Sequence, residues 1–242
     1  MDTIKINKKN VKMVAHRGVS GLERENTNAA FLAAANRSYY GIETDVHRTA
    51  DGKFVLIHDA STNRVSMGNI NINVEKSTYE EISKIVFPDL DGSAVRQDIR
   101  IPLLSEYIAI CKKYGKKCVL ELKNSFTEEE LVKITEEVNA ADYADGMIYI
   151  SFPLQNCLVL RRMLPDCEIQ FLMDAEITED TVKFLKDYRF DLDVHCRQLT
   201  KEKVELLHAN GIKVNCWTCN TEEEANKLIE MGVDFITTNI LE

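Results

Sequence analysis

The amino-acid sequence predicts an α/β protein, and within that class a (β/α)8 TIM barrel. Short apolar segments with the composition of β-strands alternate with amphipathic helical segments along almost the whole chain. Eight such strands can be counted, and the length of 242 residues is close to the roughly 250 residues typical of this barrel. We therefore expect residues 1–242 to form a single domain, with an open doubly wound sheet as the alternative.

The expected strands are spaced so that a helix fits between most of them. They comprise Lys12–His16, Gly41–Val46, Lys117–Leu122, Met147–Ser151, Glu168–Met173, Asp191–His195, Ile212–Trp217 and Asp234–Thr238. Helix starts are indicated by Thr27, Thr127 and Thr221, because threonine is a favourable N-cap. Acidic residues follow the last two of these, as a helix N-terminus prefers. Three helices are expected to stop at glycines, namely Gly115, Gly211 and Gly232.

Two intervals depart from the regular alternation. From about residue 60 to 101 the chain is polar and irregular, with a short helical pattern only around Thr78–Ile85. We interpret this interval as an insertion after the second strand. After the last strand the chain reads Thr237-Thr238-Asn239 and stops at Glu242, so the final helix is expected to be short or missing. This leaves open how the barrel closes, and a partner subunit in a homo-oligomer is one way to cover the gap.

Charge and composition argue against several classes of function. The 39 acidic residues exceed the 30 lysines and arginines, and the formal net charge of -9 works against binding nucleic acid or an anionic membrane. No apolar stretch approaches the roughly 20 residues of a membrane span, and the N-terminus lacks a signal-peptide pattern. The seven scattered cysteines are typical of reduced thiols. We expect a cytoplasmic protein.

Three carboxylates are predicted to meet at one end of the barrel. Glu43 and Asp45 are two residues apart on a strand, so their side chains project from the same face. Glu121 lies at the end of the next strand. Because the carboxyl ends of the strands converge in this fold, the three acids can approach one another. Like charges at close range need a counter-charge, and one divalent cation with oxygen ligands, Mg²⁺ or Ca²⁺, would supply it.

Histidines and cations are expected at the same end. His16 ends the first strand, and His58 follows an apolar segment after the second. Imidazole titrates near neutral pH and is therefore suited to proton transfer. Arg17 and Lys123 provide fixed positive charge for an anion such as phosphate. A cation, two histidines and two basic side chains together favour cleavage of a phosphodiester.

Short motifs in a fixed order resemble the glycerophosphodiester phosphodiesterase family. They are His16-Arg17-Gly18, Glu25-Asn26-Thr27, Glu43-x-Asp45-Val46, Thr49-x-Asp51-Gly52, His58-Asp59, Ile101-Pro102-Leu103-Leu104, Glu121-Leu122-Lys123, Ser151-Phe152, Val214-Asn215-Cys216-Trp217-Thr218-x-Asn220 and Gly232-Val233-Asp234-Phe235-Ile236-Thr237-Thr238. Each motif is weak alone, but the ordered set is specific and covers nearly the whole chain. The family's fold is a TIM barrel with an insertion after the second strand.

The resemblance implies a role for each matching residue. His16 and His58 correspond to the paired acid and base catalysts, and the divalent-metal ligands correspond to Glu43, Asp45 and Glu121. The phosphate-binding cations correspond to Arg17 and Lys123, and the aromatic residue that packs against glycerol corresponds to Trp217. The implied reaction is hydrolysis of a small glycerophosphodiester to sn-glycerol 3-phosphate and an alcohol. One departure is Asn239, since members commonly carry Asp and then Pro after the last strand.

Two other functions remain alternatives at this stage. A lysophospholipase D would act on lipid-like diesters and would need an exposed apolar lip, for which the insertion looks too polar. A catalytically silent barrel could bind a glycerophosphate without cleaving it, but the sequence retains both histidines and all three carboxylates. The sequence does not indicate which alcohol is released or which histidine is the acid.

Overall fold

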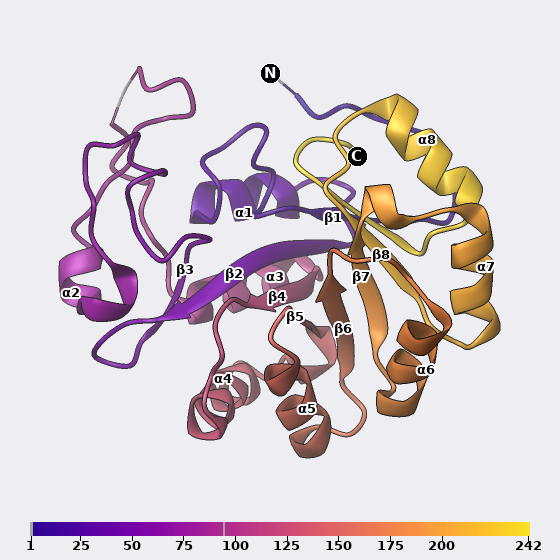
Figure 1. The fold of residues 1–242 in the computed structure, drawn as a ribbon. Helices are drawn as coiled ribbons and strands as arrows, with labels where there is room; N and C mark the ends of the chain where they lie inside the picture. Colours follow the sequence, from indigo (N-terminus) through magenta and orange to yellow (C-terminus); the bar gives the residue numbers. More distant parts are fainter. Residues whose placement is uncertain (1, 94) are drawn as a thin grey trace.

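A computed structural model describes residues 2–93 and 95–242 and confirms the predicted barrel (Figure 1). Its strands are β1 (Lys12–Ala15), β2 (Gly41–Arg48), β4 (Lys117–Leu122), β5 (Met147–Ser151), β6 (Glu168–Met173), β7 (Asp191–His195), β8 (Val214–Trp217) and β9 (Phe235–Thr238). Neighbouring strands are parallel, in the order β1-β9-β8-β7-β6-β5-β4-β2. Pairing of β1 with β2 closes the ring, which excludes the open sheet.

Seven helices connect consecutive barrel strands and lie outside them (Figure 1). They are α1 (Asn28–Ala35), α3 (Leu104–Tyr114), α4 (Glu128–Ala140), α5 (Leu154–Met163), α6 (Glu179–Tyr188), α7 (Lys201–Ala209) and α8 (Glu222–Met231). The start of α4 shows how the sequence sets these elements. The Thr127 hydroxyl accepts from the backbone N–H of Glu130, whose carboxylate accepts from the backbone N–H of Thr127. This capping box satisfies two N–H groups that have no partner within the helix.

Two sets of apolar side chains arise from the alternation along each strand. Outward-facing residues such as Leu192 and Val194 pack against the helices in the main core. The barrel interior is filled by a smaller cluster comprising Val14, Val119, Ile148, Ile150, Leu172 and Phe235. Polar residues share the interior: Asn215 donates to Gln170 at 2.9 Å and accepts from Thr237 at 3.1 Å. Apolar and polar side chains therefore share the barrel interior.

The insertion lies beside the barrel and begins with a strand that we did not predict. β3 (Phe54–Leu56) pairs antiparallel to the end of β2, with Val46 opposite Leu56. The insertion then runs through residues 57–103 and contains one short α-helix, α2 (Tyr79–Ile82), capped by Thr78. Although its sequence is largely polar, it buries its own apolar cluster, which comprises Val55, Ile57, Val65, Val74, Ile82, Ile85, Phe87, Ile99 and Ile101. The insertion is therefore a packed structure.

The expected lack of a final helix is confirmed, and the barrel closes within one chain. In the described part of the chain, residues 239–242 form backbone hydrogen bonds in place of a helix. The Ile4 N–H donates to the carbonyl of Ile240 at 3.0 Å, and the Glu242 N–H donates to the carbonyl of Ile4 at 2.8 Å. Leu241, between them, is fully buried. Together with the pairing of β1 and β9, these contacts seal the ring without a partner subunit.

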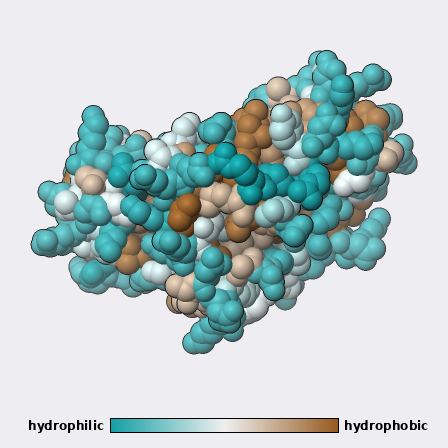
Figure 2. All heavy atoms as spheres, turned by 90° about the horizontal axis from the view of Figure 1, so that it is seen from below, coloured by the Kyte–Doolittle hydropathy of each residue, from teal (hydrophilic) through white to brown (hydrophobic). Residues whose placement is uncertain are grey.

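Among the described residues, no helix combines the length and apolarity needed to cross a bilayer. The face shown in Figure 2 is mostly hydrophilic, with small hydrophobic groups set between hydrophilic ones.

The packing of residues 239–242 predicts how a substitution there changes the free energy of unfolding. Replacing Leu241 by Ala should lower the free energy of unfolding by about 2–5 kcal/mol, because the fully buried side chain leaves a cavity. Ile4 is 45% exposed, so Ile4→Ala is a matched control that should cost less than about 1 kcal/mol. Urea unfolding measures both values. Equal effects of the two substitutions would contradict the packing described for Leu241.

Candidate active site

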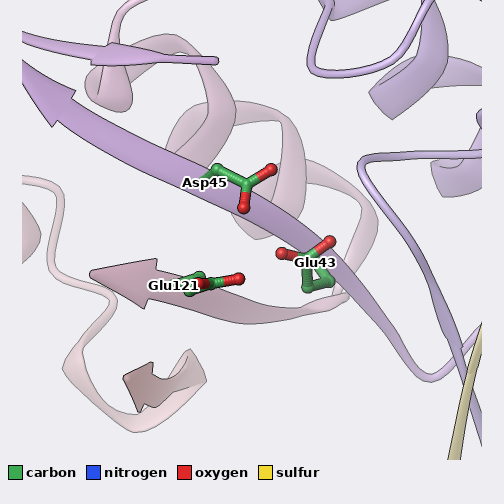
Figure 3. A group of neighbouring side chains, drawn as sticks. All are labelled: Glu43, Asp45 and Glu121. Carbon is green, nitrogen blue, oxygen red and sulfur yellow. The ribbon is translucent and has the colours of Figure 1, made fainter. Parts of the chain in front are cut away.

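Strands β2 and β4 bring three carboxylates together at the mouth of the barrel. Glu43 and Asp45 project from the same face of β2, and Asp45 lies opposite Glu121 in the pairing with β4. All three are buried. Figure 3 shows Glu43 and Asp45 along one strand and Glu121 on the next, with their carboxylates turned toward a common point. One oxygen from each lies within 4.8 Å of the others.

The crowding of these acids shifts their protonation in different directions. Burial, with the charges of Asp45 and Glu121 beside it, raises the pKa of Glu43 well above its ordinary value. Burial and Asp45 raise the pKa of Glu121 to about 7. Burial would also raise the pKa of Asp45, but the nearby Arg17 and Lys123 outweigh it and hold that pKa below its ordinary value. Without further positive charge, the three acids therefore do not all ionise at neutral pH.

The same residues fit a divalent cation. Carboxylate oxygens are the ligands that Mg²⁺ and Ca²⁺ prefer. The Oδ1 atom of Asp45 is buried and accepts no hydrogen bond from the described residues, although the Lys123 ammonium lies 3.6 Å from it. A buried acceptor of this kind is costly unless something satisfies it. The acid cluster could therefore hold one cation, which would also remove the repulsion within it.

His16 follows β1 and is held by the end of β9. Its Nδ1 atom lies 2.7 Å from the side-chain oxygen of Asn239. An amide oxygen can only accept, so Nδ1 carries the proton and Nε2 presents a lone pair. Nε2 lies 4.0 Å from Glu43 and thus faces the acid cluster. Burial and the charge of Arg17 lower the pKa of His16 to about 4.

His58 comes from the insertion, two residues after β3, and has a different partner. Its Nδ1 atom lies 2.6 Å from a carboxylate oxygen of Asp59. Arg64 holds that carboxylate from the other side, with Nε 2.7 Å from Oδ2, and also pairs with Glu25. These hydrogen bonds outweigh burial and bring the pKa of Asp59 to about 2. Asp59 is therefore ionised beside His58, whereas the partner of His16 is neutral.

Two basic side chains lie over the carboxylates. The backbone N–H of Arg17 donates to Glu43 at 2.8 Å, and its guanidinium lies 3.3 Å from Asp45. Arg17 has a φ of 54°, in the left-handed region, which turns the chain after β1 toward the cavity. The Lys123 ammonium lies 2.8 Å from Glu121 and 3.6 Å from Asp45. Both basic side chains can bind an anion that enters the mouth of the barrel.

A cavity of about 140 Å³ joins these groups. Seven of the eight predicted site residues line it, namely His16, Arg17, Glu43, His58, Glu121, Lys123 and Trp217, while Asp45 lies beside them in the acid cluster. Trp217 ends β8 and packs edge-on between Phe152 and His195, at centroid distances of 5.9 and 5.1 Å. A larger hollow of about 430 Å³ lies at the amino ends of β5 and β6, away from the predicted residues.

Several contacting residues were not predicted. Asn26 donates to Asp45 at 2.8 Å, and His47 contacts the backbone carbonyl of His58 at 3.1 Å. Asn239 and Arg64 orient the two histidines, as described above. Asp193 also lines the cavity. Two of them had a usable signal. Asp191, Asp193 and His195 alternate with apolar residues and therefore share the inner face of β7, and His47 continues the alternation of Glu43 and Asp45 along β2.

One cavity thus contains basic groups that can bind an anionic oxygen, two imidazoles and an acid cluster. These groups meet the needs of phosphodiester cleavage, and the chain belongs to the class of phosphoric diester hydrolases. Comparison with known families makes the assignment specific. The model of the Glycerophosphoryl diester phosphodiesterase family matches residues 16–242, and the chain is a member of that family.

Individual relatives agree with this assignment. A glycerophosphodiester phosphodiesterase of Caldanaerobacter subterraneus subsp. tengcongensis is 31% identical, with 94% of this chain and 93% of that protein covered. The lysophospholipase D GDPD1 of Homo sapiens is 28% identical over 94% of this chain and 82% of its own. Among solved structures, an Oleispira antarctica phosphodiesterase in complex with the product sn-glycerol-3-phosphate superposes with a TM-score of 0.85 at 25% identity, covering 97% and 95% of the two chains.

The raised pKa of Glu121 predicts that cation binding releases protons. A cation binds ionised carboxylates, so protons compete with it below the pKa of about 7. Apparent affinity for Mg²⁺ or Ca²⁺ should therefore rise with pH, by up to about tenfold per unit below pH 7 for one displaced proton. Calorimetry in two buffers of different ionisation enthalpy measures the release. Glu121→Gln should weaken this dependence of cation affinity on pH. A wild-type affinity that is constant from about pH 5.5 to 7.5 would contradict the prediction.

Proposed function

We propose that this protein hydrolyses glycerophosphodiesters to sn-glycerol 3-phosphate and an alcohol, with a bound divalent cation and two histidines. The convergence of the three carboxylates with His16 and His58 around one cavity supports this most directly. Membership of the family and the product complex of the Oleispira antarctica relative support the substrate class.

The phosphate group is proposed to bind between Arg17 and Lys123. The guanidinium can offer two parallel N–H donors to phosphate oxygens, and the ammonium adds a second positive charge opposite. When bound to Glu43, Asp45 and Glu121, Mg²⁺ or Ca²⁺ would stabilise negative charge on the phosphoryl oxygens. Arg17 and Lys123 already contact Asp45, so these two basic side chains would contact both the acid cluster and the substrate phosphate. Substrate is thereby placed against both histidines.

The partners of the two histidines support different roles for them. Burial lowers the pKa of His58, and the ionised Asp59 offsets part of that effect by stabilising a positively charged imidazole, so His58 is proposed to donate a proton to the leaving alcohol. Asn239 is neutral and keeps the Nε2 lone pair of His16 free, so His16 is proposed to take a proton from the attacking water. The water oxygen forms the new P–O bond as the bond to the alcohol breaks.

Trp217 is proposed to contact the glycerol half of the substrate. It lines the cavity and is only partly buried, which agrees with a binding surface more than with a core position. Its indole packs against Phe152 and His195, and these contacts restrain the ring at the cavity wall. The apolar faces of a glycerol carbon chain can pack on such a ring.

A dependence on divalent cation follows from this proposal. Excess chelator should abolish turnover, and adding Mg²⁺ or Ca²⁺ should restore it, because three acids would otherwise share the cavity with the phosphate. Asp45→Asn should raise the cation concentration needed for half-maximal rate. Glu80→Gln changes an exposed acid far from the acid cluster in sequence and serves as the control. Full activity in excess chelator would exclude the mechanism.

The assigned roles predict different responses to the leaving group. Replacing either histidine by Ala should lower kcat by roughly 10²–10⁴-fold with glycerophosphocholine. His58→Ala should lose far less with a p-nitrophenyl diester of glycerol phosphate, because p-nitrophenolate leaves without a proton. His16→Ala should be impaired with both substrates. Steady-state rates of both variants with the two diesters test these roles. If the p-nitrophenyl diester restored the activity of both variants equally, the roles would be wrongly assigned.

A lysophospholipase D activity is a second candidate, which the human relative and one structural feature favour. Phe152, beside Trp217 at the cavity, is 43% exposed and could contact an acyl chain. An assay of lysophosphatidylcholine beside glycerophosphocholine separates the two activities. A catalytically silent barrel would cleave neither.

We also propose that the protein is cytoplasmic. All seven cysteines are free in the structure, and six of them are buried, which suits a reducing compartment.

A further inference from the structure

One buried acid in the active-site cavity has no part in the mechanism above. Asp193 is the central residue of β7 and points into the barrel, since Leu192 and Val194 on either side pack outward. Its side chain lines the cavity on the wall next to Trp217, whose strand β8 pairs with β7. The residue is only 2% exposed.

One carboxyl oxygen of Asp193 lacks a partner among the described residues. In residues 2–93 and 95–242, no hydrogen bond reaches its buried Oδ1 atom. The Trp217 indole nitrogen, also lining this cavity and buried, likewise finds no acceptor in the described chain. Two polar groups from adjacent strands are thus unsatisfied at one side of the cavity. An unpaired buried polar group normally destabilises a protein, and such groups often serve a ligand.

Asp193 does not belong to the acid cluster. The three carboxylates that approach within 4.8 Å of one another, in the described residues, are Glu43, Asp45 and Glu121. No lysine or arginine forms an ion pair with Asp193 in this part of the chain either. Burial and the charge of Glu121 raise the pKa of Asp193 well above its ordinary value. In either protonation state a carboxyl oxygen without a partner can accept a hydrogen bond from an alcohol hydroxyl.

The surroundings indicate what kind of ligand would fit. Ile150 and Leu172, from β5 and β6, line the cavity with Asp193 and form an apolar wall. A pocket with apolar walls and a few polar groups selects a ligand that has both carbon surface and hydroxyls. A short polyol attached to the phosphate has this character, whereas a quaternary ammonium group would offer no hydrogen-bond donor to the carboxyl.

From this geometry we propose that Asp193 is a specificity-determining residue, whose carboxyl forms hydrogen bonds with a hydroxyl group of the glycerol half of the substrate. The inference rests on the proposed function, since it concerns the same cavity. It assigns to Asp193 the selection of a hydroxylated chain over an alkyl chain, and leaves phosphate binding and proton transfer to the residues already described.

Binding of product analogues tests this inference. Calorimetry with Mg²⁺ or Ca²⁺ present compares sn-glycerol 3-phosphate with n-propyl phosphate, which has the same carbons and no hydroxyls. Wild type should prefer the glycerol compound by roughly tenfold or more, because a site built for a hydroxyl rejects its absence. Asp193→Leu should lose most of that preference while binding n-propyl phosphate as well as wild type does. An unchanged preference in Asp193→Leu would overturn the proposal.

Two further variants serve as matched controls. Asp193→Asn keeps a donor and an acceptor, so it should retain the preference within a few-fold; the same loss as in Asp193→Leu would overturn the hydrogen-bonding role. Asp191→Asn changes the acid two residues earlier on the same strand face, which contacts the Lys213 backbone and not the cavity. Its preference should equal that of wild type, and a loss there would show that the effect is not specific to Asp193.

Stability and kinetics separate this inference from the proposed function. Asp193→Leu should melt no lower than wild type, because it removes an unpaired polar group; a large fall would reveal a structural partner and overturn the proposal. With glycerophosphocholine the variant should show a raised KM and should lose more kcat/KM than it does with bis(p-nitrophenyl) phosphate, which lacks glycerol. Failure of wild type to cleave glycerophosphocholine would instead refute the proposed function.

A crystal structure of wild type with sn-glycerol 3-phosphate decides the question without any variant. A glycerol hydroxyl should lie about 2.6–3.2 Å from an Asp193 carboxyl oxygen. Hydroxyls that all lie beyond hydrogen-bonding distance would overturn the inference.

Discussion

The repulsion among three buried carboxylates is the constraint around which the mouth of the barrel is organised. Glu43, Asp45 and Glu121 are held together by the pairing of β2 with β4, and the surrounding structure supplies the positive charge that this arrangement needs. Arg17 and Lys123 do so directly, and the same two basic side chains are the proposed binding groups for the phosphate. One electrostatic constraint thus accounts for the proposed cation site, the proposed phosphate site and the position of His16, which lies at the edge of the acid cluster.

Much of this arrangement could be predicted because it depends on local rules. Alternation along β2 places Glu43 and Asp45 on one face, and the convergence of strand ends brings Glu121 to them. The unpredicted parts depend on contacts far apart in sequence. β3 is too short to be recognised by its pattern and exists because it pairs with β2. The role of Asn239 requires the neighbouring position of β1 and β9. Asp193 was missed for another reason: the alternation along β7 places it on the inner face, but an acid in a strand is normally expected to face solvent.

Stability and function make opposite demands on the barrel interior. Apolar residues such as Ile148 and Phe235 fill its lower part and contribute to folding, whereas the upper part carries buried acids and unpaired polar atoms. Such groups persist because the packed lower layer and the surrounding helices fix their positions. The apolar content of the sequence therefore sustains a site that would be unfavourable if it had to fold alone.

His58 lies outside the ring of barrel strands, so the two histidines of the cavity belong to two separately packed parts of the protein. His16 and the carboxylates belong to the barrel, while His58 is carried by an insertion with a separate apolar cluster. Local opening of that cluster requires less free energy than unfolding the whole barrel. It would draw one imidazole away from the other and leave the three carboxylates in place. If His58 acts as proposed, heat inactivation would then precede the melting of the barrel, and a protein whose acid cluster is intact would already be inactive.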